Sequence, residues 1–239
     1  MVGSGSTGGI QVKNSIPIYR TDTIVAAVTG VKRKSSNPKT GDMLQLSILV
    51  RKVEPLEALR KGLDRHNCGG CLYSSKANGG NNDCYVLVGQ MPTQVYRSVK
   101  GQCIPDIVPS DIRPGKAIRL GSYGDPGFLP LSLLEAWTIG RKFTGYSHAW
   151  RTLPKSYARY LMASCETPDD VELANERGWR AYRTIEHIDS PISSSELMCV
   201  NLTHKIQCAD CRLCSGSSIG AKSIVIPLHG GRFNRRKVA

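Results

Sequence analysis

The sequence lacks three familiar signatures of catalytic sites. It contains no phosphate-binding P-loop, no G-x-G-x-x-G dinucleotide fingerprint and no H-E-x-x-H metalloprotease motif. It also lacks any apolar run of about 18 residues, the length needed to cross a bilayer. Residues 1–15 contain no basic region followed by an apolar core, as a secretory signal requires. We therefore expect a cytoplasmic protein with no membrane partner, whose cysteines stay reduced.

Acidic residues are in short supply. The 19 Asp and Glu residues oppose 32 Lys and Arg residues, which gives a formal net charge of +13. Such an excess attracts polyanions, so a nucleic acid or a nucleotide is a natural partner. The charge is dispersed and clusters only at residues 32–34 and 232–237. A solvated basic surface has the same composition, so charge alone does not establish nucleic-acid binding, and it leaves the oligomeric state open.

The hydrophobic pattern predicts an α/β protein. Residues 24–28 and 46–50 are apolar runs separated by a basic turn, which favours two neighbouring strands. Further strands are predicted at residues 85–91, 117–120, 143–150, 160–166, 179–185 and 223–230. Helices are predicted at residues 56–66, 93–101, 129–142 and 167–178, the last with Thr167 as N-cap, and a short helical turn at residues 193–198.

The alternation of strands and helices favours parallel strands with helical crossovers. The chain has about six strands of this kind, enough for an open sheet or an incomplete barrel. We favour a single domain over residues 15–239 with an incomplete (β/α) barrel-like parallel sheet and cysteine-rich metal-binding loops. Residues 1–14, rich in Gly and Ser, are expected to form a flexible tail.

Seven of the nine cysteines fall into two closely spaced groups, the pattern of metal or iron–sulfur ligands. The first group has the form C-x2-C-x12-C and comprises Cys68, Cys71 and Cys84. It supplies three ligands: His66 or Cys103 could be the fourth, or one iron could stay open to substrate. Structural zinc that pins a long loop is an equal alternative.

The second group has the form C-x8-C-x2-C-x2-C. Its three C-terminal cysteines are spaced as in bacterial-type ferredoxins, with the first cysteine as the distant fourth ligand; the members are Cys199, Cys208, Cys211 and Cys214. We favour a 4Fe–4S cluster, while zinc with His204 is the alternative. A single site shared by both groups also fits the spacing. Cys103 and Cys165 are expected to be small buried residues.

Polar residues follow several predicted strands, where the carboxyl ends of parallel strands form a site. Tyr123, Gly124 and Asp125 lie on a glycine-flanked turn that could approach a cofactor, and Asp125 could transfer a proton. A helix N-cap explains Asp125 equally well. His148 could also be catalytic, although a hydrogen-bonded histidine is the simpler interpretation. Aromatic residues near these strand ends could stack on bases or belong to the core, namely Tyr123, Tyr146 and Trp150, with Arg151 beside them.

Several segments carry a resemblance. Residues 39–64, 67–71, 83–101, 118–126, 145–151, 161–183 and 208–216 together resemble a family of uncharacterised proteins encoded mainly by bacteriophages. This resemblance implies the host cytoplasm as location and brings no activity with it. The layout is more distantly similar to the radical S-adenosylmethionine enzymes, and the DCYV segment at residues 83–86 echoes the end of their cluster loop. The C-x3-C-x2-C spacing of those enzymes is absent here.

Three functions follow from these observations. The first is an iron–sulfur protein, with radical-enzyme-like chemistry on a nucleotide or nucleic acid and S-adenosylmethionine as cofactor. The second is a zinc-stabilised protein that binds nucleic acid without catalysis. The third is an accessory protein that binds a host protein and uses its metals as staples.

Overall fold

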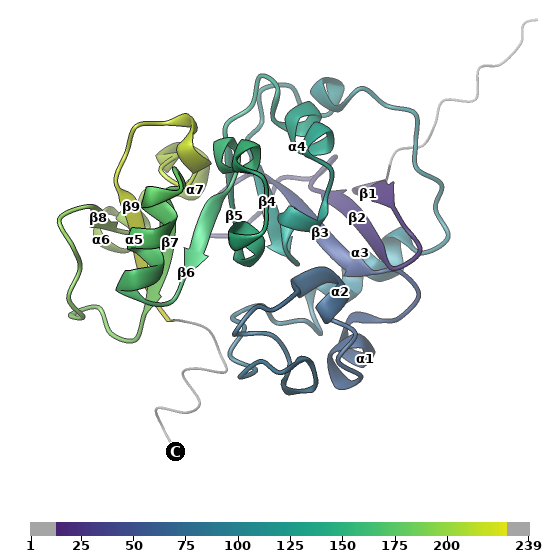
Figure 1. Ribbon diagram of the computed structural model, residues 1–239. Coiled ribbons are helices and arrows are strands. Elements are labelled where there is room, and N and C mark those ends of the chain that lie inside the picture. Colours follow the sequence, from purple (N-terminus) through teal and green to yellow (C-terminus); the bar gives the residue numbers. More distant parts are fainter. Residues whose placement is uncertain (1–12, 229–239) are drawn as a thin grey trace, which may run out of the picture.

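The computed structural model describes residues 13–228. Nine strands form one open sheet in the order β1-β2-β3-β4-β5-β6-β7-β9-β8. β1 (Ser15–Arg20), β2 (Ile24–Thr29) and β3 (Leu44–Val50) pair antiparallel, and every pair from β3 onward is parallel. Figure 1 shows the sheet running from β1 on the right to β8 and β9 on the left. The predicted α/β architecture is therefore confirmed as an open, mostly parallel sheet.

The parallel part contains β4 (Ile118–Tyr123), β5 (Phe143–Ser147), β6 (Met162–Cys165), β7 (Ala181–Ile185), β9 (Ser223–Pro227) and β8 (Glu196–Met198). The helices of the connections are α4 (Leu131–Thr138) between β4 and β5, and α5 (Pro168–Glu176) between β6 and β7. α5 begins with the predicted cap: Thr167 accepts from the main chain of Asp170, whose carboxylate accepts in return from the main chain of Thr167.

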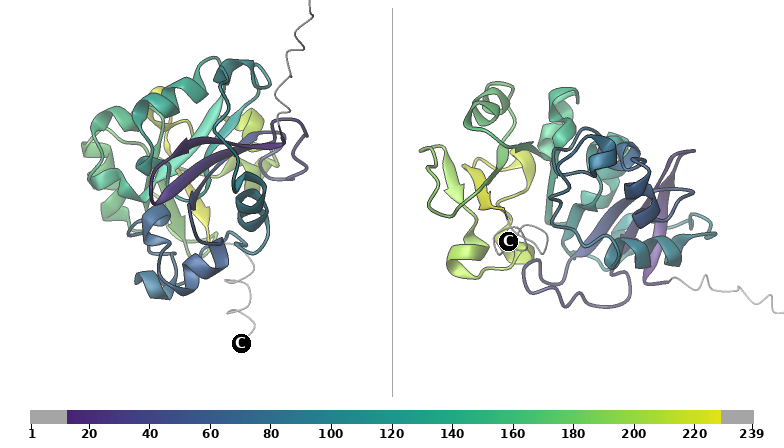
Figure 2. Two further views of the ribbon diagram at one scale, coloured as in Figure 1. Left: turned by 90° about the vertical axis from the view of Figure 1, so that its right-hand side faces the viewer. Right: turned by 90° about the horizontal axis from the view of Figure 1, so that it is seen from below.

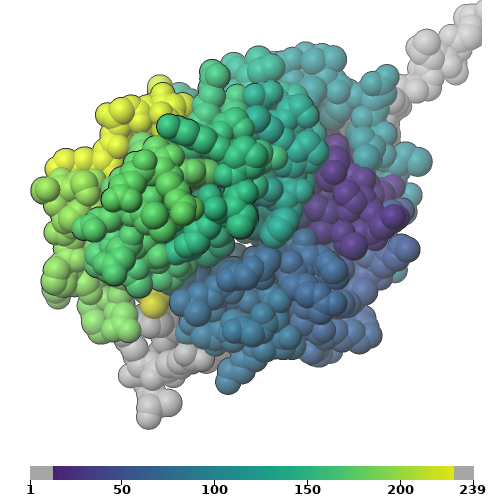
Figure 3. All heavy atoms as spheres, viewed as in Figure 1, coloured from purple at the N-terminus to yellow at the C-terminus, as the bar shows by residue number. Residues whose placement is uncertain are grey.

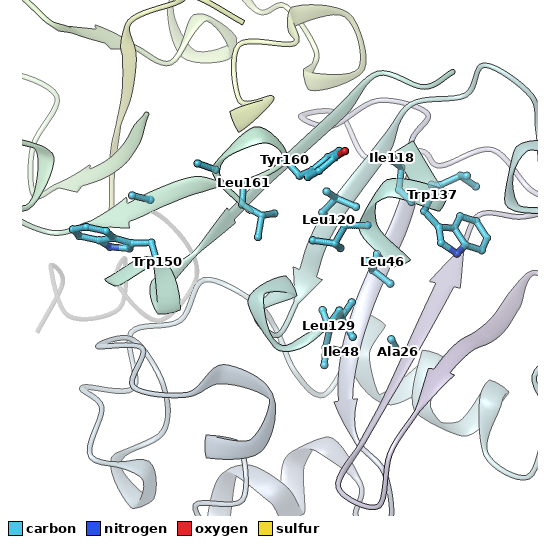
Figure 4. Close-up of a cluster of buried hydrophobic side chains, with 14 of the residues drawn as sticks. Ala26, Leu46, Ile48, Ile118, Leu120, Leu129, Trp137, Trp150, Tyr160 and Leu161 are labelled. Carbon is cyan, nitrogen blue, oxygen red and sulfur yellow. The ribbon is translucent and has the colours of Figure 1, made fainter. Parts of the chain in front are cut away.

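Alternate residues of each strand face opposite sides of the sheet, and the two sides pack into separate hydrophobic clusters. Leu46 and Leu120 join the main cluster with Leu134 and Trp137 of α4, as the close-up in Figure 4 shows. The opposite face of β2 and β3 packs against α3 (Met91–Val99). The opposite face of β6, β7 and β9 is a third cluster, which partly buried cysteines of the second group adjoin. The period of two in the strands thus gives each face its own covering.

The remaining helices are short and lie in the two cysteine segments. α1 (Pro55–Arg60) precedes the first group, and α2 (Arg65–Cys68) ends at its first cysteine. α6 (Val200–His204) and α7 (Cys208–Cys211) lie within the segment of the second group. Figure 2 gives two further views of these segments against the sheet. In the space-filling view of Figure 3, the blue segment with the first cysteines abuts the green segment beyond residue 140.

Several element predictions were wrong. Residues 85–90 form turns instead of a strand, because the chain must reverse into α3 while Val88 still reaches the core. Residues 196–198 are β8 instead of a helical turn, since they pair with β9. The strand β1 was not predicted. The predicted helix over residues 56–66 breaks at Gly62, where φ is +65°.

Other predictions concern residues near or beyond the ends of the described range, residues 13–228. Of the predicted tail, Asn14 accepts main-chain hydrogen bonds from Gly30 and Val31, while residues 1–12 lie outside the described part. The basic cluster at 232–237 and the last two residues of the predicted strand 223–230 also lie outside it. Cys165 is buried as expected, whereas Cys103 is exposed on a surface loop, so that prediction was wrong.

Candidate functional site

The three cysteines of the first group line one cavity of about 80 Å³. Cys68 ends α2, Cys71 follows one turn later, and Cys84 ends the loop. The opposite wall comes from the ends of β4 and β5, with Gly121 to Asp125, Tyr146 and His148. Five of the seven residues predicted for this part of the site therefore meet the cysteines at the carboxyl ends of parallel strands. Trp150 belongs to the main core instead, and Arg151 does not line the cavity.

The loop between these cysteines is held by its own hydrogen bonds. The fully buried Asp64 accepts from the main chain of Ser75 at 2.9 Å and from its hydroxyl at 2.7 Å. The amide of Asn78 donates to the carbonyl of Gly69, and the main chain of Cys84 donates to Tyr73. These hydrogen bonds fix the course of the loop around the three cysteines.

Asp125 connects the ends of β4 and β5. One carboxylate oxygen accepts from the main chain of Gly127 at 2.8 Å, and the other accepts from the main chains of His148 at 2.7 Å and Ala149 at 3.3 Å. Its side chain caps the short helical turn after β4. Both oxygens are therefore engaged in positioning the cavity wall, which is the capping role anticipated as an alternative to catalysis.

His148 directs its Nε2 atom at three side chains. That atom lies 3.5 Å from Sγ of Cys71, 3.0 Å from Oγ of Ser164 and 3.4 Å from Oε1 of Glu166. Burial lowers the pKa of His148, but the contacts with Cys71 and Glu166 outweigh it and raise that pKa well above its usual value. In a Cys–His–acid relay the cysteine and the acid contact different ring nitrogens of the histidine. Here Cys71 and Glu166 both contact Nε2 of His148. The geometry therefore does not support such a relay.

A second cavity of about 90 Å³ adjoins the first group. Cys71, Cys84, Tyr85, Tyr146 and His148 line both cavities. The other walls of the second cavity are formed by aromatic, hydroxyl and apolar side chains and one acidic residue, namely Tyr73, Asp83, Ser164, Tyr182, Thr184, Ile226 and Leu228. Two of the three first-group cysteines are thus accessible from two sides.

The second cysteine group is attached to the sheet by main-chain hydrogen bonds. Cys199 donates to Val225 of β9 at 2.9 Å, and Cys208 donates to Lys39 at 3.0 Å. The carbonyl of Cys214 accepts from Gly145 of β5 at 3.1 Å. Burial raises the pKa of the Cys214 thiol, and the charges of the other three cysteines raise it further. The four thiols are therefore close enough for the charges of three of them to affect the pKa of the fourth.

The proposed fourth ligands do not join these groups. Neither His66 nor Cys103 lines the first-group cavity, and Cys103 lines a different one beside Arg20. His204 is exposed and its Nδ1 atom lies 2.7 Å from the hydroxyl of Thr203. In the first group, His148 is the histidine that the structure brings to the cysteines.

All nine cysteines are free thiols. Cysteine thiolates are the ligands of zinc and of iron–sulfur clusters, so the donor chemistry of both groups fits either metal. Across residues 13–228, however, no three or more His, Cys, Asp and Glu side chains are arranged as a group that could hold a metal ion. The cysteines are gathered, but their side chains do not form a finished coordination shell.

Sequence reasoning missed several residues of the site. Arg119, Tyr85 and Tyr182 were not singled out, although Tyr85 follows Cys84 directly and Arg119 interrupts an apolar strand. Glu166 is a further residue of the site. Its place beside His148 depends on the pairing of β5 with β6, which the sequence does not specify.

Comparisons with family models, with curated proteins and with solved structures found no match. Within residues 13–228, no helix combines the length and the apolar character needed to span a membrane.

Proposed function

We propose that this protein is an iron–sulfur protein with two centres. Cys68, Cys71 and Cys84 would hold the reactive one, and Cys199, Cys208, Cys211 and Cys214 the auxiliary one. The observation that carries the proposal is the first-group cavity, where three cysteines of one loop face the carboxyl ends of β4 and β5. Three thiolate ligands leave one iron of a 4Fe–4S cluster open to a small molecule.

The incomplete-barrel interpretation and the likeness to radical S-adenosylmethionine enzymes belong to this proposal, and the parallel pairing of the strands from β3 onward supports them. In that case the turn at Gly121 to Asp125, which lines the cavity beside the cysteines, would receive the cofactor. The second cavity would receive part of a nucleotide or nucleic acid, since its tyrosines offer flat faces for a base. A phage origin and a place in the host cytoplasm belong to the same proposal.

Anaerobic purification followed by iron, sulfide and zinc analysis tests the assignment. Two 4Fe–4S clusters correspond to about eight irons and eight sulfides per chain, with a broad absorbance band near ~400 nm. Cys71→Ser and Cys211→Ser should each remove about half of the iron. Cys103→Ser is the matched control, because Cys103 is exposed and lies outside both groups, and it should leave the iron content unchanged. A colourless protein that contains only zinc would overturn the proposal.

The cofactor requires a separate experiment. The iron-loaded protein would be reduced with dithionite and incubated with S-adenosylmethionine, and cleavage of the cofactor would be followed by chromatography. Cleavage in the wild type and its loss in Cys71→Ser would support the radical-enzyme hypothesis. Full iron content without cleavage would leave an iron–sulfur protein of another kind.

The alternative is a zinc-stabilised nucleic-acid-binding protein. The contact between His148 and Cys71 favours it, because three cysteines and one histidine are a common structural zinc set. This function predicts zinc in the purified protein and DNA binding whose logarithmic affinity falls linearly with the logarithm of salt concentration.

A further inference from the structure

Arg119 lies between two phenol groups. It is on β4, where Ile118 and Leu120 face the main core and Arg119 faces the other side. Its Nη2 atom donates to the hydroxyl of Tyr146 at 2.7 Å and to the hydroxyl of Tyr85. The two hydroxyls are themselves 3.2 Å apart. The guanidinium is thus held in place by Tyr85 and Tyr146.

The charge of Arg119 has no acidic partner within the described part of the chain. Two other arginines show the usual solutions. The buried Arg183 pairs with Glu196, and Arg180 donates to three main-chain carbonyls. Arg119, like Arg180, donates to neutral oxygens, and the two phenols leave its positive charge uncompensated.

The phenols that hold Arg119 connect the two cysteine groups. Tyr85 and Tyr146 line the first-group cavity together with its three cysteines. The ring of Tyr146 stacks on Tyr182 with centroids 4.4 Å apart and planes at 7°. Tyr182 belongs to the buried cluster against which Cys199 and Cys214 pack. A continuous path of side chains therefore runs from one cysteine group to the other.

Arg119 also lies beside the strand to which the second group is attached. Its register partner on β5 is Thr144, next to Gly145, which donates to the carbonyl of Cys214. The uncompensated cation is therefore close to the second group and linked through its phenols to the first.

We propose that Arg119 is the shared counter-ion of the two cysteine centres, positioned by Tyr85 and Tyr146. This inference rests on the proposed iron–sulfur function and names a residue that tunes both centres. Each reduction adds one electron, and hence one negative charge, to a centre already ligated by thiolates. A nearby cation stabilises the added charge, so it raises the reduction potential of the centre. Arg119 is a positioning residue and not a catalytic one.

The test is an anaerobic redox titration with dithionite as the one-electron donor, followed by electron paramagnetic resonance. Arg119→Gln removes the charge and keeps hydrogen-bond donors for the phenols. It should lower the potential of the second centre so that, at a fixed solution potential, the ratio of reduced to oxidised centre falls about tenfold. For a one-electron couple this equals about 59 mV. The first centre should shift in the same direction by less, since its link runs through the phenols.

Two variants serve as controls. Arg97→Met removes a positive charge at an exposed position on α3, where Arg97 pairs with Glu54, and should leave both potentials unchanged. The titration repeated in the Cys71→Ser background, where only the second group keeps all of its cysteines, assigns the shift to that centre. If Arg119→Gln does not fold by circular dichroism, Arg119→Met supplies a neutral side chain of similar length.

The outcomes separate the inference from the proposed function. Unchanged potentials in a folded, fully iron-loaded Arg119 variant would overturn the counter-ion role and leave the iron–sulfur assignment intact. A wild-type protein that carries only zinc would overturn both. A lowered potential in the Arg119 variant together with an unchanged one in Arg97→Met would support the inference.

Discussion

The side-chain amide of Asn67 donates a hydrogen bond of 2.9 Å to the main-chain carbonyl of Ile48. Asn67 is fully buried and directly precedes Cys68, while Ile48 lies near the end of β3. The carbonyl of Asn67 also accepts from the main chain of Asp125 at 2.6 Å. The first cysteine is therefore fixed to the ends of two neighbouring strands by one residue.

Gly124 lies inside this arrangement. Its φ is +76°, and an added Cβ would lie 2.5 Å from the carbonyl oxygen of Ile48 and 3.0 Å from that of Asn67. Gly124→Ala should therefore lower the free energy of unfolding by about 3 kcal/mol, from the strained φ and the clash together. Gly115→Ala is the control, because its φ is +69° but its Cβ would meet open space. It should cost about 1 kcal/mol, and urea unfolding that gives equal losses would contradict the clash.

Asp64 is expected to govern the shape of the first cysteine loop. Asp64→Ala leaves the main chain and the hydroxyl of Ser75 without their buried acceptor, at a cost of about 3 kcal/mol. The metal content of the first group should fall while that of the second is retained, which elemental analysis can measure. Asp22→Ala, at a fully exposed carboxylate, should change stability by less than about 0.5 kcal/mol. Full metal content in Asp64→Ala would show that the loop forms without this support.

The ion pair of Arg183 and Glu196 links β7 to β8. Nε and Nη2 of Arg183 lie 2.7 and 2.8 Å from the two carboxylate oxygens, and both side chains are buried. Glu196→Gln leaves the guanidinium buried without a counter-charge and should cost about 3–5 kcal/mol in urea unfolding. The double variant Arg183→Met with Glu196→Leu should recover most of this loss. A double variant as unstable as the single one would indicate that the polar geometry itself is required.

The pH dependence of stability should include a contribution from Asp42. Hydrogen bonds from Arg113, opposed by burial and aided by Lys116, hold the pKa of Asp42 well below its usual range. A carboxylate with a depressed folded pKa stabilises the protein fully above its unfolded pKa of about 3.9. That contribution is lost as the pH falls further, toward the folded pKa.

Asp42→Asn tests this dependence. At neutral pH the variant should be less stable by about 1–2 kcal/mol, because it loses charge-assisted hydrogen bonds to Arg113 and Lys116. The difference between wild type and variant should shrink as the pH is lowered from about 5 to about 2. Denaturant unfolding at several pH values measures it, and a difference that stays constant with pH would rule out the ionised carboxylate as its source.

The sequence indicated most of the scaffold because its signals are local. The apolar runs of β2, β3, β6, β7 and β9 and the capped helix α5 depend on neighbours only a few residues away. Predictions failed where the tertiary structure outweighed local preference. Residues 85–88 are apolar and favour a strand, but the chain bends and turns there before α3 begins. Conversely, β8 has three residues and exists only through its pairing with β9.

What the sequence by itself determined is the inventory of the candidate site: two groups of closely spaced cysteines, and polar residues that follow strands. The tertiary structure alone decided which of them meet. His148 reaches Cys71 across 77 positions of the chain, and Arg119 is enclosed by phenols from the cysteine loop and from β5. Such contacts depend on strand order and on the side of the sheet that each residue faces. Both are set by the packing of the whole sheet, which no local pattern encodes.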